Sequence, residues 1–302
     1  MVFSFLSIAS VCGSYLRRCF TDVGLSRQAL DIDDETTIHF WGPNRATSTK
    51  QSLVLLHGFG PVSIWQWRRQ VEFFAPDYNV YVPDLVFFGD STTKSAERSE
   101  IFQANCVVKL LEKLGVEKYY VIGTSYGGMI AYNMARLWPE RLAGKVVIAS
   151  SGVNMRKSDN EEFVKRAKQE SIGNVMVPQN ASELRALLHV AANRRLPLVP
   201  DFFLNDFVKQ LYGDKRDEKL ELLKGLSIGK EETPNITPLQ QDVLLVWGEN
   251  DQIFPLEMAR KLERIIGEKV KLEIIPNASH VPQMEKPTRF NFIVKNFLSG
   301  SS

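Results

Sequence analysis

Apolar and polar residues alternate along the chain in two periods, one typical of strands and one typical of helices. Residues 51–56 form a short run that is apolar on both faces, residues 79–83 indicate the next strand, and helices are expected after them over residues 64–74 and 99–114. Strands of this kind are typical of a parallel sheet covered by helices. The pattern therefore predicts an α/β fold with a doubly wound, mostly parallel sheet.

The same alternation continues through the middle of the chain and resumes near its end. Residues 118–122 predict a strand, a helix that ends before Pro139 follows, and residues 145–149 predict another strand. Strand, helix, strand and helix are then expected over residues 242–247, 256–266, 269–275 and 288–298. An antiparallel hairpin over residues 30–32 and 37–41 is expected at an edge of the sheet.

The alternation stops between residues 151 and 237, where helical stretches over residues 161–169, 181–192 and 217–223 occur without intervening strands. We interpret residues 151–237 as a helical cap inserted between two parts of one core, residues 29–150 and 238–302. The inner face of such a cap would shape a pocket. A separate globular domain is the alternative, which the shortness of the segment disfavours because it buries little surface alone.

Residues 1–28 form an apolar or amphipathic N-terminal segment, in which Arg17 and Arg18 follow a mostly apolar run. A signal peptide has its positive charge before the apolar run, and this run is short for a membrane span, so a cleaved or spanning segment is disfavoured. Two interpretations stay open. The segment is either a helix packed on the domain, or an interfacial anchor that gives weak association with a membrane surface.

Charge and cysteine content narrow the function classes. The chain has 37 basic and 35 acidic residues without long blocks of either sign, which disfavours a nucleic-acid partner. Cys12, Cys19 and Cys106 are too scattered for a disulfide framework and lack the spacing of metal-ligand pairs. We therefore expect a cytoplasmic protein, with membrane association through the N-terminal segment as an option, and chemistry that uses neither a metal nor a cofactor.

A Gly-x-Ser-x-Gly motif lies at the junction between a predicted strand and a predicted helix, at Gly123-Thr124-Ser125-Tyr126-Gly127. That context distinguishes a nucleophile elbow from an ordinary glycine-serine turn. The glycines omit side chains where backbones crowd, and the new helix directs its N-terminal amides at developing negative charge. Ser125 is therefore the candidate nucleophile.

A serine hydroxyl needs a base to activate it, and the base needs an acid to orient it. Of the four histidines, His280 lies between the last predicted strand and the last predicted helix, on the same rim as the elbow. His57 is better explained as a residue that shapes its loop, whereas His39 and His189 are expected to be structural or solvated.

The orienting carboxylate is expected at another strand end on that rim. Asp251 follows the strand over residues 242–247, and the order Ser125, Asp251, His280 is the one expected for this arrangement. Glu249 begins the turn, and Asp84 and Asp90 follow an earlier strand, where a role in loop structure is more plausible.

The tetrahedral intermediate of acyl transfer needs two hydrogen-bond donors for its oxyanion. We expect the backbone amide of Tyr126, directly after the nucleophile, to supply one of them. The backbone amide of Phe59, in the glycine-flanked loop after His57 and Gly58, is expected to supply the other.

Several motifs together resemble the α/β-hydrolase superfamily over residues 51–297. They are His57-Gly58-Phe59-Gly60-Pro61, Pro83-Asp84-Leu85 with Gly89-Asp90-Ser91, Gly123-Thr124-Ser125-Tyr126-Gly127-Gly128, Gly248-Glu249-Asn250-Asp251-Gln252-Ile253-Phe254-Pro255 and Asn277-Ala278-Ser279-His280. The resemblance implies the triad of Ser125, Asp251 and His280 and the oxyanion amides of Phe59 and Tyr126. Epoxide hydrolases and haloalkane dehalogenases of this fold carry Asp at the position of Ser125, so those activities are disfavoured.

Further motifs narrow the resemblance within the superfamily. Trp65-Gln66-Trp67, residues 82–91 and Ser125-Tyr126-Gly127-Gly128 look like a plant group. That group is similar to monoacylglycerol lipase-like esterases and to bacterial hydrolases of carbon–carbon bonds in ring-cleavage products. The sequence of the expected cap does not select a substrate.

Three functions follow from these observations. The first is a cofactor-independent serine hydrolase for a carboxylic ester with an apolar acyl or alcohol part. The second is a hydrolase of carbon–carbon bonds in vinylogous diketones that uses the same residues. The third is a small-ligand receptor that keeps a triad with residual hydrolysis and signals through movement of the cap.

Overall fold

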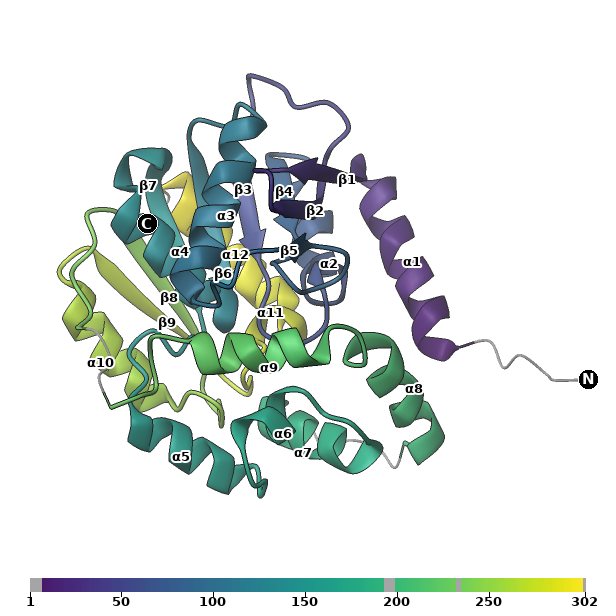
Figure 1. The fold of residues 1–302 in the computed structure, drawn as a ribbon. Coiled ribbons are helices and arrows are strands. Elements are labelled where there is room, and N and C mark those ends of the chain that lie inside the picture. Colours follow the sequence, from purple (N-terminus) through teal and green to yellow (C-terminus); the bar gives the residue numbers. More distant parts are fainter. Residues whose placement is uncertain (1–6, 193–198, 232–234, 301–302) are drawn as a thin grey trace, which may run out of the picture.

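The computed structural model describes residues 7–192, 199–231 and 235–300, and within them the chain forms a nine-stranded sheet with helices on both faces (Figure 1). The strands lie in the order β1-β2-β4-β3-β6-β7-β8-β9, with β5 (Thr92–Thr93) paired to β2. The six strands from β4 to β9 along this order are parallel, as the sequence predicts. They are β4 (Asn79–Pro83), β3 (Ser52–Leu56), β6 (Tyr119–Thr124), β7 (Leu142–Ala149), β8 (Asp242–Gly248) and β9 (Val270–Ile275).

The expected hairpin is present at one edge of the sheet. Strands β1 (Leu25–Asp31) and β2 (Thr36–Pro43) form an antiparallel pair, and β2 also pairs antiparallel with β4. The first strand begins at Leu25, five residues before the predicted start at Leu30, because the polar residues between them occupy an edge strand that alternates between buried and solvent-facing positions.

Successive side chains of the central strands enter two separate apolar layers. In β3, Val54 and Leu56 face the layer that contains α3 (Glu100–Lys113), α4 (Tyr126–Leu137) and α10 (Leu256–Ile266). Leu53 and Leu55 face the layer that contains α2 (Ser63–Phe74) and α12 (Pro287–Ser299). Burial on both sides explains why these strands read as continuous apolar runs in the sequence.

The described part of residues 151–237 forms helices between β7 and β8 and no strand. Figure 1 shows these helices gathered along one side of the molecule, below the sheet. They are α5 (Lys157–Arg166), α6 (Ile172–Met176), α7 (Ala181–Ala191), α8 (Asp201–Leu211) and α9 (Arg216–Gly225). The sequence prediction missed α6 and α8, and residues 193–198 and 232–234 of this range lie outside the described residues.

The N-terminal segment contains helix α1 (Ile8–Asp22), which packs on the domain; its first six residues lie outside the described part. Phe20 is buried against Trp41, and the side chain of Asp206 in α8 accepts hydrogen bonds from Ser7 Oγ and the Ala9 amide. This arrangement agrees with the packed alternative. Within the described residues, every helix is too short or too polar to cross a lipid bilayer. Association with a membrane surface stays a prediction.

Candidate active site

Ser125 lies on a strained turn between β6 and α4. Its φ of 54° and ψ of −117° are rare for a residue with a side chain. The turn is so tight that the backbones leave no room for side chains. A Cβ on Gly123 would lie 2.1 Å from the Gly127 oxygen, and a Cβ on Gly127 would lie 2.2 Å from the Leu56 oxygen. Neither position therefore accepts a side chain without a shift of the backbone. The glycines of the motif are explained by this close approach of three backbone segments.

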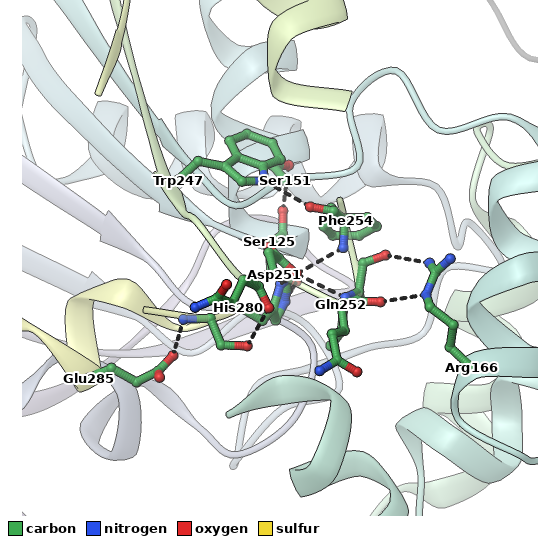
Figure 2. Close-up of polar contacts among 12 residues, drawn as sticks. Ser125, Ser151, Arg166, Trp247, Asp251, Gln252, Phe254, His280 and Glu285 are labelled. Carbon is green, nitrogen blue, oxygen red and sulfur yellow. Dashed lines mark hydrogen bonds and ion pairs between the residues drawn. The ribbon is translucent and has the colours of Figure 1, made fainter. Parts of the chain in front are cut away.

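Hydrogen bonds from the neighbouring strand hold the backbone of Ser125. Its amide donates to the Ala149 oxygen over 2.9 Å, and the hydroxyl of Ser151 donates to its carbonyl oxygen over 2.7 Å (Figure 2). Both partners come from the end of β7 and the loop after it. The side chain stands at the carboxyl ends of the parallel strands, where sites of open α/β sheets form.

The loops after β8 and β9 bring Asp251 and His280 to the same place. A Cβ on Gly248, the last residue of β8, would lie only 1.9 Å from the Ser279 oxygen, so the two loops pack backbone against backbone. The amide of Asn250 donates to the Ala278 oxygen over 2.9 Å. This contact fixes the position of one loop relative to the other.

The three candidate side chains form a continuous chain of hydrogen bonds. His280 Nε2 lies 3.0 Å from Ser125 Oγ, and His280 Nδ1 lies 3.0 Å from Asp251 Oδ2 (Figure 2). A carboxylate only accepts, so Nδ1 carries the proton of the neutral ring and the lone pair of Nε2 faces the serine hydroxyl. That arrangement lets the imidazole take a proton from Ser125.

The carboxylate of Asp251 is buried and is held by its own turn. Its Oδ1 accepts hydrogen bonds from the amides of Ile253 and Phe254, both over 2.9 Å, while Trp247 Nε1 donates to the Phe254 oxygen. Arg166 of α5 donates to the Gln252 oxygen and so ties the helices of residues 151–237 to this turn (Figure 2). Asp251 therefore has a fixed orientation toward His280.

The other acidic residues considered from the sequence have different partners. Glu249 accepts from the Asn277 amide, Asp84 accepts from the amide and hydroxyl of Ser63, and Asp90 pairs with Arg27. Burial raises the pKa of Asp84 to about 6.

The loop after β3 is fastened by two side chains, Gln66 and His57. Gln66 of α2 accepts from the Gly58 amide over 2.9 Å, and its Nε2 donates to the oxygens of Gly58 and Pro61 over 3.1 and 2.8 Å. His57 Nδ1 lies 2.8 Å from the Gly58 oxygen, and His57 Nε2 accepts from the Leu85 amide over 3.0 Å. His57 thus shapes its loop.

These contacts orient the peptide group between Gly58 and Phe59. The C=O and N–H of a trans peptide point in opposite directions, so holding the Gly58 oxygen on Gln66 and His57 directs the Phe59 N–H away from both of them. Burial, together with the nearby charge of Lys219, lowers the pKa of His57 to about 4, so the ring stays neutral at physiological pH. Sequence reasoning assigned no role to Gln66. The only hint in the sequence was that Gln66 lies one turn into the helix that follows this loop, close enough to contact it.

Two cavities meet at Ser125. The larger one has a volume of about 380 Å³ and includes His280, Trp65 and Met284 in its wall. The smaller one has a volume of about 40 Å³ and is lined, apart from Ser125, by apolar and aromatic side chains such as Met129 and Phe254. A surface hollow of about 490 Å³ near Lys145 and Lys269 lies where β7, β8 and β9 begin, and its wall contains none of the three candidate residues.

Comparison with protein families identifies the family of the chain. The family model described as alpha/beta hydrolase fold matches residues 51–287, which include Ser125, Asp251 and His280. The chain belongs to the alpha/beta hydrolase fold family.

This α/β hydrolase is similar to known hydrolases over most of its length. It is 27% identical to the 2-hydroxy-6-oxononadienedioate/2-hydroxy-6-oxononatrienedioate hydrolase of Escherichia coli K12, over 87% of this chain and 91% of that protein. The relatives named here are bacterial, and the plant group suggested by the motifs stays a prediction.

Solved structures show the same fold. A bacterial membrane phospholipase A has a TM-score of 0.78 at 22% identity, covering 97% of this chain and 91% of the other. The 2-hydroxy-6-oxo-6-phenylhexa-2,4-dienoate hydrolase of Rhodococcus sp. strain RHA1 has a TM-score of 0.73 at 20% identity, with coverages of 91% and 99%. A carboxylesterase of Bacillus subtilis has a TM-score of 0.68 at 19% identity, with coverages of 96% and 99%. The fold of this α/β hydrolase is therefore shared by hydrolases of different substrates.

Proposed function

We propose that this α/β hydrolase is a serine hydrolase that cleaves a carboxylic ester with an apolar part through an acyl-enzyme. The observation that carries the proposal is the chain of contacts from Asp251 through His280 to Ser125, with 3.0 Å between ring nitrogen and hydroxyl oxygen. This chain ends at the junction of two largely apolar cavities, so the hydroxyl is placed where an apolar ester can reach it.

In the first half of the reaction, Ser125 Oγ forms a bond to the ester carbonyl carbon while His280 Nε2 takes the hydroxyl proton. The tetrahedral intermediate then breaks its bond to the alcohol oxygen, which receives that proton from His280. Asp251 keeps the ring oriented and stabilises its positive charge while the proton resides there. The acyl group remains on Ser125 as an ester.

In the second half, water replaces the alcohol. His280 takes a proton from the water as its oxygen bonds to the acyl carbon, and returns that proton to Ser125 Oγ as the carboxylic acid leaves. No redox partner or metal is needed for the balance of either half.

The negative charge of both intermediates rests on the former carbonyl oxygen, for which we assign the amides of Phe59 and Tyr126 as donors. Tyr126 is the first residue of α4, where helical N–H groups have no partner within the helix. The Phe59 amide is directed by the contacts of Gln66 and His57 with the Gly58 oxygen. Both donors are main-chain groups on fastened segments, so they need little reorganisation during the reaction.

We further propose that residues 151–237 act as a cap over a core made of residues 29–150 and 238–302. Met176 of α6 and Leu187 and Leu188 of α7 contribute to the wall of the larger cavity, together with residues of the core such as Trp65. The helices between β7 and β8 would then set the size and polarity of the substrate site.

A hydrolase of carbon–carbon bonds is the second candidate, and the Escherichia coli relative favours it. The substrate in that relative's name is a dicarboxylate, and a buried carboxylate needs a cationic partner. Among the described residues that line the two cavities, no lysine or arginine occurs, and Glu285 is acidic. These walls suit a neutral ester better than a dicarboxylate.

The proposal is tested with a fluorophosphonate probe, which labels activated serines. Wild type and Ser150→Ala are expected to be labelled and Ser125→Ala is not; Ser150 is a buried neighbour whose Oγ has no partner in the described part of the chain. Labelling of Ser125→Ala at the wild-type rate would reject the nucleophile.

Turnover then separates the functions. Faster hydrolysis of para-nitrophenyl butyrate than of a vinylogous diketone supports the esterase, and the reverse supports the carbon–carbon bond hydrolase. Thermal stabilisation by a ligand with negligible turnover of both would instead support a receptor.

A further inference from the structure

The two cavities at Ser125 differ in which catalytic group they contain. The walls of both include Ser125, Phe59, Met176 and Ile253, so these residues form the junction between them. His280 belongs to the wall of the larger cavity and not, among the described residues, to that of the smaller one. An ester bound with its carbonyl carbon at Ser125 therefore has one part in each cavity.

The direction of the ester follows from the path of the proton. Under the proposed function, His280 Nε2 must deliver its proton to the alcohol oxygen as that oxygen leaves, which requires the two atoms to be within hydrogen-bond reach. The alcohol part then lies on the side of His280. The acyl substituent points away from the imidazole, because the carbonyl carbon is bonded to Ser125 between the two.

We propose that the larger cavity binds the alcohol part and the smaller cavity binds the acyl part, so that the preferred substrates are esters of a short acyl group with a bulky apolar alcohol. This inference rests on the proposed serine hydrolase activity. The volumes of about 380 and 40 Å³ set the two sizes. The smaller cavity holds only a few heavy atoms, since a single water needs on the order of 10–15 Å³ of such space.

The chemistry of the walls agrees with this assignment. Met129, Met155 and Phe254 close the smaller cavity with apolar groups, which suits a short alkyl chain, and among the described residues its wall contains no charged side chain. The larger cavity has Trp65, Leu187 and Met284 in its wall and so suits an extended or ring-shaped hydrocarbon. Each methylene buried there is expected to raise kcat/KM about fourfold until the cavity is full.

The test compares octyl acetate with methyl nonanoate, two isomers with the same atoms and nearly the same hydrophobicity. One has a short acyl group and a long alcohol, and the other has the reverse. The expected result is a kcat/KM at least tenfold higher for octyl acetate. Equal values, or a preference for methyl nonanoate, would overturn the assignment of the cavities.

The outcome is separable from failure of the proposed function. If Ser125 takes the fluorophosphonate label but neither isomer is hydrolysed, the substrate class proposed here is wrong while the serine hydrolase assignment stands. If Ser125 does not take the label, the proposed function itself is wrong.

Two leucine-to-alanine variants test which cavity limits the length of the acyl chain. Leu223 of α9 lines the smaller cavity and Leu188 of α7 lines the larger one. Leu223→Ala is expected to lower the ratio of octyl acetate to methyl nonanoate turnover at least fivefold, because it makes room for a longer acyl chain, whereas Leu188→Ala does not lower it in this way. Unfolding curves of both variants establish that the assayed proteins are folded. A fall in the ratio for Leu188→Ala alone would assign the cavities in the opposite order.

Discussion

Gln66→Met is expected to slow catalysis because Gln66 holds the loop that carries the Phe59 amide. The substitution keeps the length of the side chain and removes its three hydrogen bonds to the loop after β3, those with the Gly58 amide and with the oxygens of Gly58 and Pro61. The Gly58 oxygen keeps His57 as a partner. The peptide group that carries the Phe59 amide is then held from one side only, and its N–H no longer has a single direction.

The magnitude follows from the groups left without a partner. The Gly58 amide is buried, and a buried polar group without a partner costs about 1–3 kcal/mol, so together with the Pro61 oxygen we expect a stability loss of roughly 2–5 kcal/mol. Complete loss of one oxyanion donor lowers kcat by about 10²–10³. Because His57 retains part of the orientation, we expect a fall in kcat of about 10–10².

Asn79→Leu is the matched control. Asn79 also accepts one backbone hydrogen bond and donates two, with Thr47 and Lys50, but it lies at the first residue of β4, at the opposite end of the strand from the loop that follows it. Its removal is expected to lower stability without touching the site. The effect of lost stability is thereby separated from the effect of a misdirected amide.

The assay measures kcat and KM for para-nitrophenyl acetate, well below the unfolding temperature of each variant. Gln66→Met is expected to lower kcat while KM stays within about twofold, because the oxyanion donor acts mainly on the transition state. Asn79→Leu is expected to keep both parameters within about twofold. A wild-type kcat for Gln66→Met, or an equal loss in both variants, would refute the orienting role of Gln66.

Three further predictions concern the triad, the pH dependence and the elbow. Asp251→Asn is expected to lower kcat by about 10³–10⁴, because an amide favours the wrong tautomer of His280; an unchanged pH profile of kcat/KM with an unchanged rate would contradict this. Burial raises the pKa of Asp84 from 3.8 to about 6, so its folded state binds the proton more tightly and stability is lost as pH rises through that window. Burial lowers the pKa of His57 from 6.5 to about 4, so stability is lost as pH falls, and the two effects oppose each other. Urea unfolding is therefore expected to show Asp84→Asn gaining roughly 2.5 kcal/mol relative to wild type between pH 4 and 7, and a constant difference would refute the linkage. Gly127→Ala is expected to abolish soluble folded protein or kcat, since its Cβ would lie 2.2 Å from a backbone oxygen, and circular dichroism with an esterase assay decides the point.

Where the hydrophobic pattern was strong, the sequence predicted the fold closely. The strand β4 and the helix α10 have the predicted bounds, Asn79–Pro83 and Leu256–Ile266, because one is buried on all sides and the other has a clear apolar face. Helix α8 was missed, although Leu204 and Val208 are buried at helical spacing. Only packing against α1 and α7 makes that short amphipathic stretch recognisable.

The candidate site was accessible to sequence reasoning only in part. The order of motifs and the common rim of a parallel sheet suggested that Ser125, Asp251 and His280 would meet, and the structure brings them within hydrogen-bond distance. The contact of Gln66 with the Gly58 peptide depends on how α2 lies against the loop after β3, for which no local pattern exists. The division into two cavities likewise depends on side chains from many helices and loops that lie far apart in the sequence.

The strain at Ser125 suggests that the turn in the core and the helices of residues 151–237 differ in how well they accept substitutions. A positive φ in a residue with a side chain costs about 1–3 kcal/mol and persists only where the surroundings determine it. Here the Ser125 amide donates a hydrogen bond to the Ala149 oxygen, and Gly123 and Gly127 are in close contact with neighbouring backbone. Such a turn tolerates few substitutions, so the residues at the carboxyl ends of the strands that hold Ser125 are expected to be strongly constrained. The cavity walls contributed by α6, α7 and α9 do not take part in this strained turn. Under the proposed function, substitutions there would change which ester fits without disturbing Ser125.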